Sequence, residues 1–457
     1  MTDTSLQPAQ DLHGLSPDLL RAIIDAVDAE DLVRLEALVV PLHAADQADL
    51  LEQVGGAQRR VVIEALGPDI DAEILPDLDD AVLDDIRKEL GLETFARLVG
   101  KLDSDDAVDV IADLDDPVRR EVLEAVPAPE RRAVEQGLTF PEDSAGRLMR
   151  HDVVALPMFW NVGQTIDHLR GASDLPDEFY AVFVVDPGHR PLGVIALATL
   201  IRSERQVELT SLVEGEPLTV KADTDQEEIS WLFQQYGLSE VAVVDGHDRL
   251  LGTITFDDMA DVLSEESEED VLRLGGVAGT DLNQGVIDTT RKRFWWLFIN
   301  LGTAVMASMV IGIFEGTIRE IVALAVLMPI VASMGGNAGT QTMTVAVRAL
   351  ATRDLTRANG LRVIGKEILV GALNGILFAT ITGLVAWVWF QSPLLGVVIA
   401  MAMVANLVVA GFIGAATPLV LERFGIDPAV AASVFLTTVT DVVGFFVFLA
   451  LGALLLI

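Results

Sequence analysis

The chain has 457 residues, which is longer than one soluble domain usually is, and its charge divides it into two halves of different character. Residues 1–290 hold 62 acidic and 21 basic side chains, whereas the remaining residues hold 7 and 10. An acidic surface of this kind repels nucleic acid, which we do not expect as a partner, and attracts cations. The chain has no cysteine and all six histidines precede position 250, so the second half offers a metal ion only oxygen ligands.

The first part of the chain is predicted to be all α-helical. Residues 1–15 have neither the basic start nor the apolar core of a cleavable signal peptide, so none is expected. From Pro17 to about Gln136, apolar residues recur at three- and four-residue spacing, and Asp precedes many of these runs. Short helices of this kind bury their apolar stripes only by stacking. We therefore expect a helical N-domain over residues 1–140, a right- or left-handed superhelix of helix pairs.

An internal duplication follows the helical region. Residues 183–197, FVVDPGHRPLGVIAL, match residues 242–256, AVVDGHDRLLGTITF. Each copy indicates a strand, a turn, a strand and a helix, and another predicted helix precedes each copy. Such tandem α/β units resemble cystathionine-β-synthase (CBS) domains, here over residues 141–203 and 204–262. The resemblance implies a cleft that often binds adenine nucleotides, although no specific phosphate-binding sequence is present.

An acidic connector over residues 263–290 joins these units to the apolar half. It contains the run SEESEED, breaks at Gly275-Gly276 and is followed by Arg-Lys-Arg at 291–293. Helical spacing places five carboxylates on overlapping sides of two consecutive helical stretches. They are Asp258, Asp261, Glu266, Glu269 and Asp270. A solvated acidic face would have the same pattern, so the spacing leaves both interpretations open.

Five apolar stretches are long enough to cross a bilayer, whose hydrocarbon core of about 30 Å needs roughly 20 helical residues. They run from 294 to 314, from 321 to 347, twice within 368 to 421 with an interruption at 391–393, and from 428 to 457. Nine of the ten basic residues after position 290 fall on one side of these stretches, so the positive-inside rule predicts a cytoplasmic N-terminus and an extracytoplasmic C-terminus. We expect a multi-pass domain with five spans over residues 291–457, in the cytoplasmic (inner) membrane.

Asp441 is the one ionisable residue inside these apolar stretches. A carboxylate there costs at least about 2.5–3.5 kcal/mol, which makes it a functional-site hypothesis, although a protonated Asp bonded to a neighbouring helix is the alternative. It lies 14 residues after Asp427, or about 21 Å along a helix. An oxygen-only site suits a hard cation such as Mg²⁺. Because one Asp gives little neutralisation, a two-fold homodimer with Asp441 from both chains is expected.

The second apolar stretch contains PIVASMGGNAGTQ, residues 329–341. Pro and the Gly pair weaken a helix, so the helix is expected to open here and expose oxygen ligands beside a water-filled cavity. Close packing of helices on the small residues is the alternative, and Asn406 fits either a pore or a tie between helices. The pore-lining candidates are Gly335, Gly336, Asn337, Gln341, Asn406, Ser433 and Thr437.

The order of helical domain, tandem CBS units, acidic connector and five spans resembles the MgtE family of magnesium channels. The motifs P-x4-MGGNAGTQ and TTVTDVVG are similar to its two membrane signatures. The resemblance implies a homodimeric pore in which Asp441 binds a largely hydrated Mg²⁺ ion. It also implies that cytosolic Mg²⁺ bridges the N-domain, CBS units and connector through Asp258, Asp261, Glu266, Glu269 and Asp270, and thereby closes the pore. Asp427 is a further candidate metal ligand.

Two positions depart from the family pattern. Ser433-Val434 stands where relatives often have Asn-Pro or Gly-Pro, which affects the expected selectivity at the cytoplasmic mouth. Gly237 stands where some relatives use an acidic residue in regulation. A proton- or sodium-coupled divalent cation transporter and a membrane-anchored nucleotide sensor remain alternatives. An enzyme is least favoured, because the sequence has no nucleophile–base pair, P-loop or catalytic metal motif.

Overall fold

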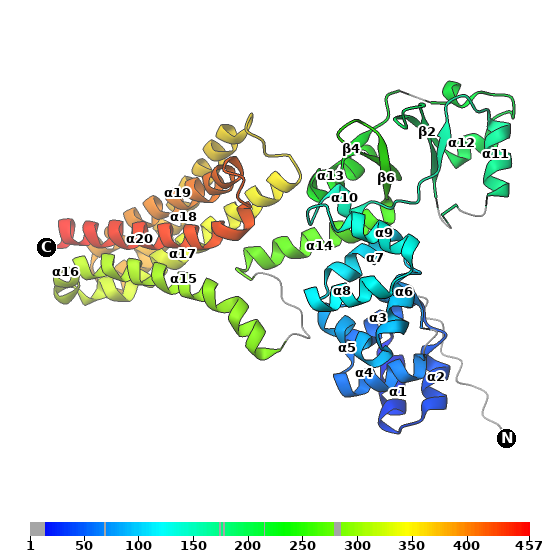
Figure 1. Ribbon diagram of the computed structural model, residues 1–457. Coiled ribbons are helices and arrows are strands. Elements are labelled where there is room, and N and C mark those ends of the chain that lie inside the picture. Colours follow the sequence, from blue (N-terminus) through cyan, green and yellow to red (C-terminus); the bar gives the residue numbers. More distant parts are fainter. Residues whose placement is uncertain (1–13, 68–69, 173–174, 177–178, 214, 278–284) are drawn as a thin grey trace, which may run out of the picture. The chain divides into compact units, whose positions relative to one another are not determined.

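The computed structural model describes residues 14–457 except 68–69, 173–174, 177–178, 214 and 278–284, and leaves out the side chains of 430–433. The chain forms two compact units, which divide within one helix after Ser264. The first unit contains the helical domain and two small α/β domains, and the second contains the long apolar helices (Figure 1).

The helical domain has short helices whose starts are fixed by polar caps. Ser16 accepts a hydrogen bond from the backbone N–H of Leu19 at 3.2 Å, and Asp31 accepts one from that of Arg34 at 3.2 Å. The α-helices are α1 (Pro17–Asp28), α2 (Leu32–Val39), α3 (Ala44–Gln53), α4 (Gly56–Leu66), α5 (Asp80–Leu90), α6 (Leu92–Val99), α7 (Ser104–Ala112), α8 (Asp116–Ala125) and α9 (Ala128–Gly137), with a 3₁₀ turn at η1 (Ala72–Ile74). Because α2 packs on α4, α6 on α8 and α7 on α9, their apolar stripes share one core, as the sequence predicted.

The duplicated sequence folds twice into the same small sheet. The first copy has β1 (Ala155–Pro157), α11 (Val162–Gly171), β2 (Ala181–Val185), β3 (Pro191–Ala196) and α12 (Leu197–Arg202). The second copy has β4 (Thr219–Lys221), α13 (Gln226–Tyr236), β5 (Glu240–Val244), β6 (Leu250–Thr255) and α14 (Phe256–Leu274). The central strand of each sheet is fully buried, with a parallel neighbour and an antiparallel one, and the register shifts at equivalent residue pairs. The tandem α/β prediction is thereby confirmed.

Two shorter elements lie at the edges of these domains. Helix α10 (Ala145–Leu148) packs against α7, α9, α13 and β4, and thus connects the helical domain with the second sheet. A 3₁₀ turn, η2 (Leu209–Ser211), lies between the two copies in the chain.

The second unit contains five helices that are long and apolar enough to cross a membrane, as predicted. They are α15 (Val286–Ile313), α17 (Val322–Ala351), α18 (Gly360–Phe390), α19 (Pro393–Arg423) and α20 (Pro428–Leu456), with the short α16 (Glu315–Glu320) after α15. Helix α19 packs against α17, α18 and α20 (Figure 1). A Cβ at Gly371 would lie 2.5 Å from the Leu407 carbonyl oxygen, so small residues allow α18 and α19 to approach closely.

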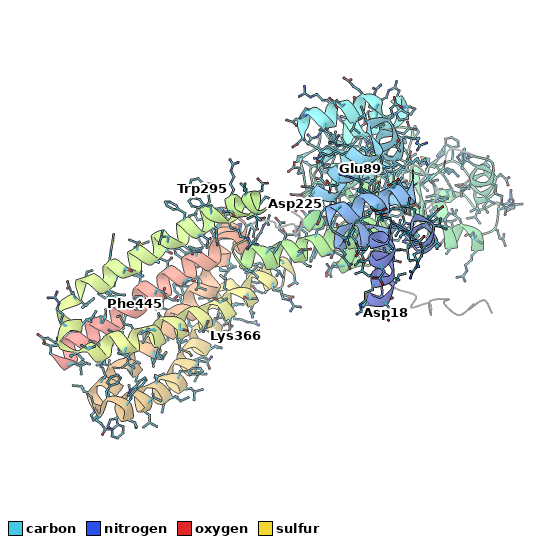
Figure 2. The ribbon with its side chains drawn as sticks, turned by 90° about the horizontal axis from the view of Figure 1, so that it is seen from below. Asp18, Glu89, Asp225, Trp295, Lys366 and Phe445 are labelled. Carbon is cyan, nitrogen blue, oxygen red and sulfur yellow. The ribbon has the colours of Figure 1, made fainter. Side chains whose placement is uncertain are left out.

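The outer surface of this unit has the features of a lipid contact. Large apolar side chains are exposed along α15 and α18, and Trp295 points away from the bundle near the start of α15 (Figure 2). Lys366 lies near the start of α18. The helices extend beyond the predicted apolar stretches, so they include ionisable residues such as Glu367 near their ends.

Two local expectations were wrong. Helix α17 does not open after Pro329 but continues to Ala351, because a neighbouring helix packs onto it there: a Cβ at Gly339 would lie 2.6 Å from the Leu436 side chain. The connector does not form two helical stretches before Gly275, since α14 is one continuous helix from Phe256 to Leu274.

Candidate functional site

Asp441 lies on α20 and is partly buried within the second unit, which we call the membrane unit. Its Thr neighbours bond to their own helix: the Thr438 hydroxyl donates to the Val434 carbonyl at 2.7 Å, and the fully buried Thr440 hydroxyl donates to that of Leu436 at 3.0 Å. Within the described part of a single chain, the Asp441 carboxylate makes no hydrogen bond or ion pair, and no cluster of three or more His, Cys, Asp or Glu side chains is poised to hold a metal. A tie to a neighbouring helix therefore does not account for Asp441 here.

Asn406 on α19 is fully buried and connects helices instead of facing an open surface. Its Nδ2 donates to the Val331 carbonyl of α17 at 2.8 Å. A Cβ at Gly335 would lie 2.1 Å from this Nδ2, and one at Gly444 of α20 would lie 2.8 Å from it. Asn406 thus occupies space that two glycines leave at the meeting point of three helices, which supports the tie between helices that the sequence left open.

The other pore-lining candidates have different surroundings. A Cβ at Gly336 would meet no atom within 4 Å, and Asn337 and Gln341 are exposed in the single chain. Thr437 lies on α20, one turn before Asp441. Ser433 falls outside the described side chains, so its role stays a prediction.

Sequence reasoning missed a cavity of about 160 Å³, with a mixed polar and apolar lining, between α17, α18 and α19. Its polar lining comprises Gln341, Thr342, Glu367 and Asn374, and the Thr342 hydroxyl donates to the Glu367 carboxylate at 3.2 Å. The signal was weak because Glu367 lies just outside the predicted apolar stretch and has a basic neighbour.

The end of α14 carries one group of the predicted metal-binding carboxylates, within the second unit. The Arg273 guanidinium pairs with Glu269 on its own helix and with Asp427, the N-cap of α20. Burial raises the pKa of Asp270, and the neighbouring Asp427 and Glu266 raise it further. The structure therefore brings four predicted residues, Glu266, Glu269, Asp270 and Asp427, to one place, together with a cation that the sequence did not single out.

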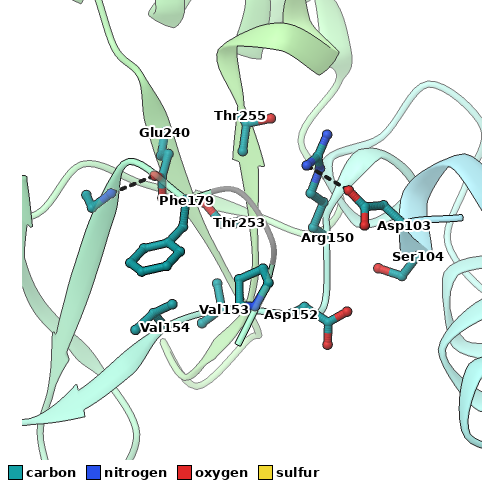
Figure 3. A pocket seen from close by; sticks show the side chains of 12 residues that line it. Asp103, Ser104, Arg150, Asp152, Val153, Val154, Phe179, Glu240, Thr253 and Thr255 are labelled. Atoms are coloured by element: carbon teal, nitrogen blue, oxygen red, sulfur yellow. Dashed lines mark hydrogen bonds and ion pairs between the residues drawn. The ribbon is translucent and has the colours of Figure 1, made fainter. Parts of the chain in front are cut away.

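The start of α14 carries a second acidic group, within the first unit, around Arg150. This guanidinium, only 16% exposed, contacts Asp103, Asp105, Asp257 and Asp258 at 2.9, 3.1, 3.2 and 2.5 Å. We call Arg150 and these four residues, with the adjacent Asp106, the Arg150 cluster (Figure 3 shows part of it).

Burial and repulsion shift the titration of this cluster. Burial first, and then the nearby Asp258, hold the pKa of Asp105 well above its usual range and raise that of Asp106 to about 7. Burial and the neighbouring Asp258 and Asp257 also raise the pKa of Asp261. Burial and Asp261 in turn raise the pKa of Asp77 in the helical domain. The acidic side chains of α14 therefore face those of the helical domain closely enough to repel them.

A small cavity separates the two sheets beside the Arg150 cluster (Figure 3). The Glu240 carboxylate accepts hydrogen bonds there from the backbone N–H groups of Tyr180 and Ala181 at 2.6 and 2.8 Å. The cavity of about 20 Å³ is of the size that holds one water molecule. Adenine-nucleotide binding by the tandem α/β units stays a prediction.

Gly237 has a structural role. It ends α13 in the left-handed conformation, with φ 61° and ψ 47°, and its N–H donates to the Phe233 carbonyl. Because a side chain is strained in this conformation, glycine is favoured here whatever relatives have at the position.

Comparison with known proteins identifies similar chains. Family models match at residues 328–451 (MgtE, divalent cation transporter), 42–143 (MgtE intracellular N domain) and 210–265 (CBS domain). The chain is 32% identical to the magnesium transporter MgtE of Thermus thermophilus, over 94% of this chain and 97% of that protein. It is 25% identical to the magnesium transporter MgtE of Bacillus subtilis, over 95% and 96%. A solved structure of the cytosolic domain of the Mg²⁺ channel MgtE in complex with ATP is 28% identical and covers 53% of this chain and 99% of that one, with a TM-score of 0.49.

Proposed function

We propose a magnesium channel closed by cytosolic magnesium, starting from the fact that this chain belongs to the MgtE family of magnesium transporters. The observation that carries the proposal is Asp441, a carboxylate without a described partner on an apolar helix of the membrane unit. A charge in this environment is costly, which makes Asp441 the leading candidate for a functional residue.

The pore would be completed by a second copy of the chain. One carboxylate neutralises only half the charge of Mg²⁺, whereas two Asp441 side chains related by a two-fold axis match it. Since Mg²⁺ gives up its waters reluctantly, we propose that the two carboxylates hold a largely hydrated ion through its water shell. Asn337 and Gln341 on α17, both exposed in the single chain, would supply further oxygen atoms to the pore.

Gating would use the acidic groups at the two ends of α14. Two unit charges at 4 Å repel by about 4 kcal/mol at an effective dielectric of 20, so carboxylates that face one another favour separation. Mg²⁺ bound between them removes this repulsion. The equilibrium then shifts toward the compact form by as much as the affinity of Mg²⁺ for that form exceeds its affinity for the separated form. The pairing of Arg273 with Asp427 supports this mechanism, because it joins the end of α14 directly to the start of α20, the helix of Asp441.

The proposed direction of transport is influx across the cytoplasmic membrane. The basic residues at the starts of α15 and α18 favour an N-terminus in the cytoplasm, where the acidic groups would sense cytosolic Mg²⁺.

The test is magnesium flux into liposomes that contain the full-length protein. Asp441→Asn should lower flux by at least tenfold, because the neutral amide attracts Mg²⁺ less strongly. Glu315→Gln is the matched control, since Glu315 pairs with Arg319 at an exposed helix end. Normal flux through Asp441→Asn would remove Asp441 from the pore. Flux that requires a proton or sodium gradient would favour a coupled transporter over a channel.

A further inference from the structure

The cavity between α17, α18 and α19 exists because two helices pack on a third and make few contacts with each other. A Cβ at Gly411 of α19 would lie 2.6 Å from the Glu367 carbonyl oxygen of α18, and one at Gly414 would lie 2.7 Å from the Gly339 carbonyl oxygen of α17. Each glycine thus admits the backbone of one neighbour. Helices α17 and α18 are held against α19, and the space between them forms the cavity of about 160 Å³.

Both walls of this cavity carry oxygen atoms. Gln341 and Thr342 lie on α17, whereas Glu367 and Asn374 lie on α18. The Thr342 hydroxyl donates to Glu367 Oε2 at 3.2 Å, so the carboxylate reaches toward α17. Glu367 is half-buried, and within the described part of the chain it forms no ion pair. The cavity therefore holds one negative charge that no described cation contacts.

Glu367 lies close to the edge of the bilayer. Helix α18 has 31 residues and is about 46 Å long, whereas the hydrocarbon core is about 30 Å thick. About 8 Å of a centred helix therefore projects at each end. Glu367 is about 10 Å from the start of the helix at Gly360, so water and ions reach it from the adjacent aqueous phase.

The size and chemistry of the cavity suit a hydrated ion. One water molecule takes about 30 Å³ in the liquid, so the cavity has room for about five. Mg²⁺ keeps several of its waters in proteins and is held by one or two carboxylates. Glu367 supplies one such carboxylate, and the hydroxyl and amide oxygens around it can accept hydrogen bonds from the waters. No three His, Asp or Glu side chains of the described residues are arranged to hold a metal directly, so the ion would keep its water shell.

We propose that Glu367 forms a second cation-binding site of the membrane unit, which holds a largely hydrated Mg²⁺ ion between α17 and α18. Gln341, Thr342 and Asn374 orient its waters. Asp441 does not line this cavity, so the site is separate from the proposed pore ligand. Because Gln341 is also a pore candidate, the cavity adjoins the proposed pore, and the site concentrates Mg²⁺ beside it. The inference rests on the proposed function in taking Mg²⁺ as the ion and in placing the pore beside Gln341.

The test uses the absence of cysteine from the chain, because a single introduced thiol then reports on this cavity alone. Val345→Cys places a thiol in the cavity lining and leaves the four polar side chains in place. The thiol is modified with uncharged methyl methanethiosulfonate in the full-length protein in detergent, with a chelator or with Mg²⁺ at equal ionic strength. For a dissociation constant of about 1 mM, as in weak carboxylate sites, about 10 mM Mg²⁺ should slow modification about tenfold.

Two substitutions of Glu367 show whether the carboxylate holds the ion. Glu367→Gln should abolish the protection of the thiol by Mg²⁺, because the neutral amide attracts the ion less strongly. Glu367→Asp retains the charge and should keep part of the protection, which also keeps the test informative should Glu367→Gln fail to fold. Equal modification of Val345→Cys with and without Mg²⁺, or protection that survives Glu367→Gln, would overturn the proposal.

Val322→Cys is the matched control, at the opposite end of α17. Val322 is 65% exposed and Val345 64%, so both thiols are open to the reagent, and the modification rate of Val322→Cys should not change with Mg²⁺. In nanodiscs of phosphatidylcholine, Val345→Cys should show the same protection by Mg²⁺ as in detergent. Protection that appears only with phosphatidylethanolamine and does not depend on Mg²⁺ would assign the cavity to a lipid ammonium group instead. Asp441→Asn should leave the protection intact while it lowers flux, so this proposal and the proposed function fail separately.

Discussion

Replacing Gly335 by alanine should destabilise the membrane unit, because the new methyl group has no space. Its Cβ would lie 2.1 Å from Asn406 Nδ2 and 2.8 Å from Asn406 Cγ. The Asn406 side chain cannot move away freely: it is fully buried, bonds to Val331 at 2.8 Å, and also lies against Gly444. Loss of this buried hydrogen bond costs about 1–3 kcal/mol and overpacking about 1–3 kcal/mol. The expected destabilisation is therefore about 2–6 kcal/mol.

Gly336→Ala provides a matched control one residue away, since a Cβ there meets no atom within 4 Å. Thermal unfolding of both variants in detergent should lower the midpoint for Gly335→Ala alone. In the double variant Gly335→Ala/Asn406→Ala, the smaller partner should recover part of the loss, which a double-mutant cycle measures. Equal midpoints for the two single variants would refute this account of α17 packing and would revive the prediction of an opened helix at this motif.

Two further predictions concern the acidic groups. Asp106→Asn should stabilise α7 at high pH. The pKa of Asp106 is about 7 in the folded protein and 3.8 in the unfolded chain, so between these values the folded state binds a proton that the unfolded state has lost. The stability of the wild-type protein therefore falls as the pH rises from about 4 to 7, and the neutral amide avoids this loss. Relative to wild type, the free energy of unfolding of Asp106→Asn should be almost unchanged at pH 4 and higher by at most about 4 kcal/mol at pH 8. Urea unfolding in the presence of a chelator measures this difference. Stabilisation that appears at pH 4 instead would contradict the raised pKa of Asp106. Arg273→Ala leaves Asp270 and Asp427 to repel each other. Loss of a partly exposed ion pair costs about 1 kcal/mol, which corresponds to about a fivefold shift toward the open form. Magnesium flux at low cytosolic magnesium should therefore rise about fivefold. Arg319→Ala, at another exposed pair, should leave flux unchanged, and equal flux from the two variants would exclude Arg273 from gating.

Local patterns were enough to predict most of the fold. The repeat of FVVDPGHRPLGVIAL as AVVDGHDRLLGTITF requires two equivalent sheets, because a strand pattern and its turn are properties of neighbouring residues. The five apolar stretches were equally clear, since length and hydropathy alone identify a helix as a candidate membrane span. Asp441 also needed no structure, because a single carboxylate in such a stretch is conspicuous in the sequence.

The sequence by itself determined which segments are helical, sheet-forming or apolar, and which carboxylate is exceptional. Tertiary structure decided which side chains meet. Propensity predicted that α17 would open at Pro329 and the Gly pair, but packing of Asn406 and Leu436 on its glycines keeps it continuous. Spacing along α14 grouped its acids together. It could not reveal that Arg150, more than a hundred residues earlier, pairs with acids at one end of the helix while Arg273 pairs with Glu269 and Asp427 at the other. Charge pairing across long sequence separations depends on the folded path of the chain, which periodicity does not contain.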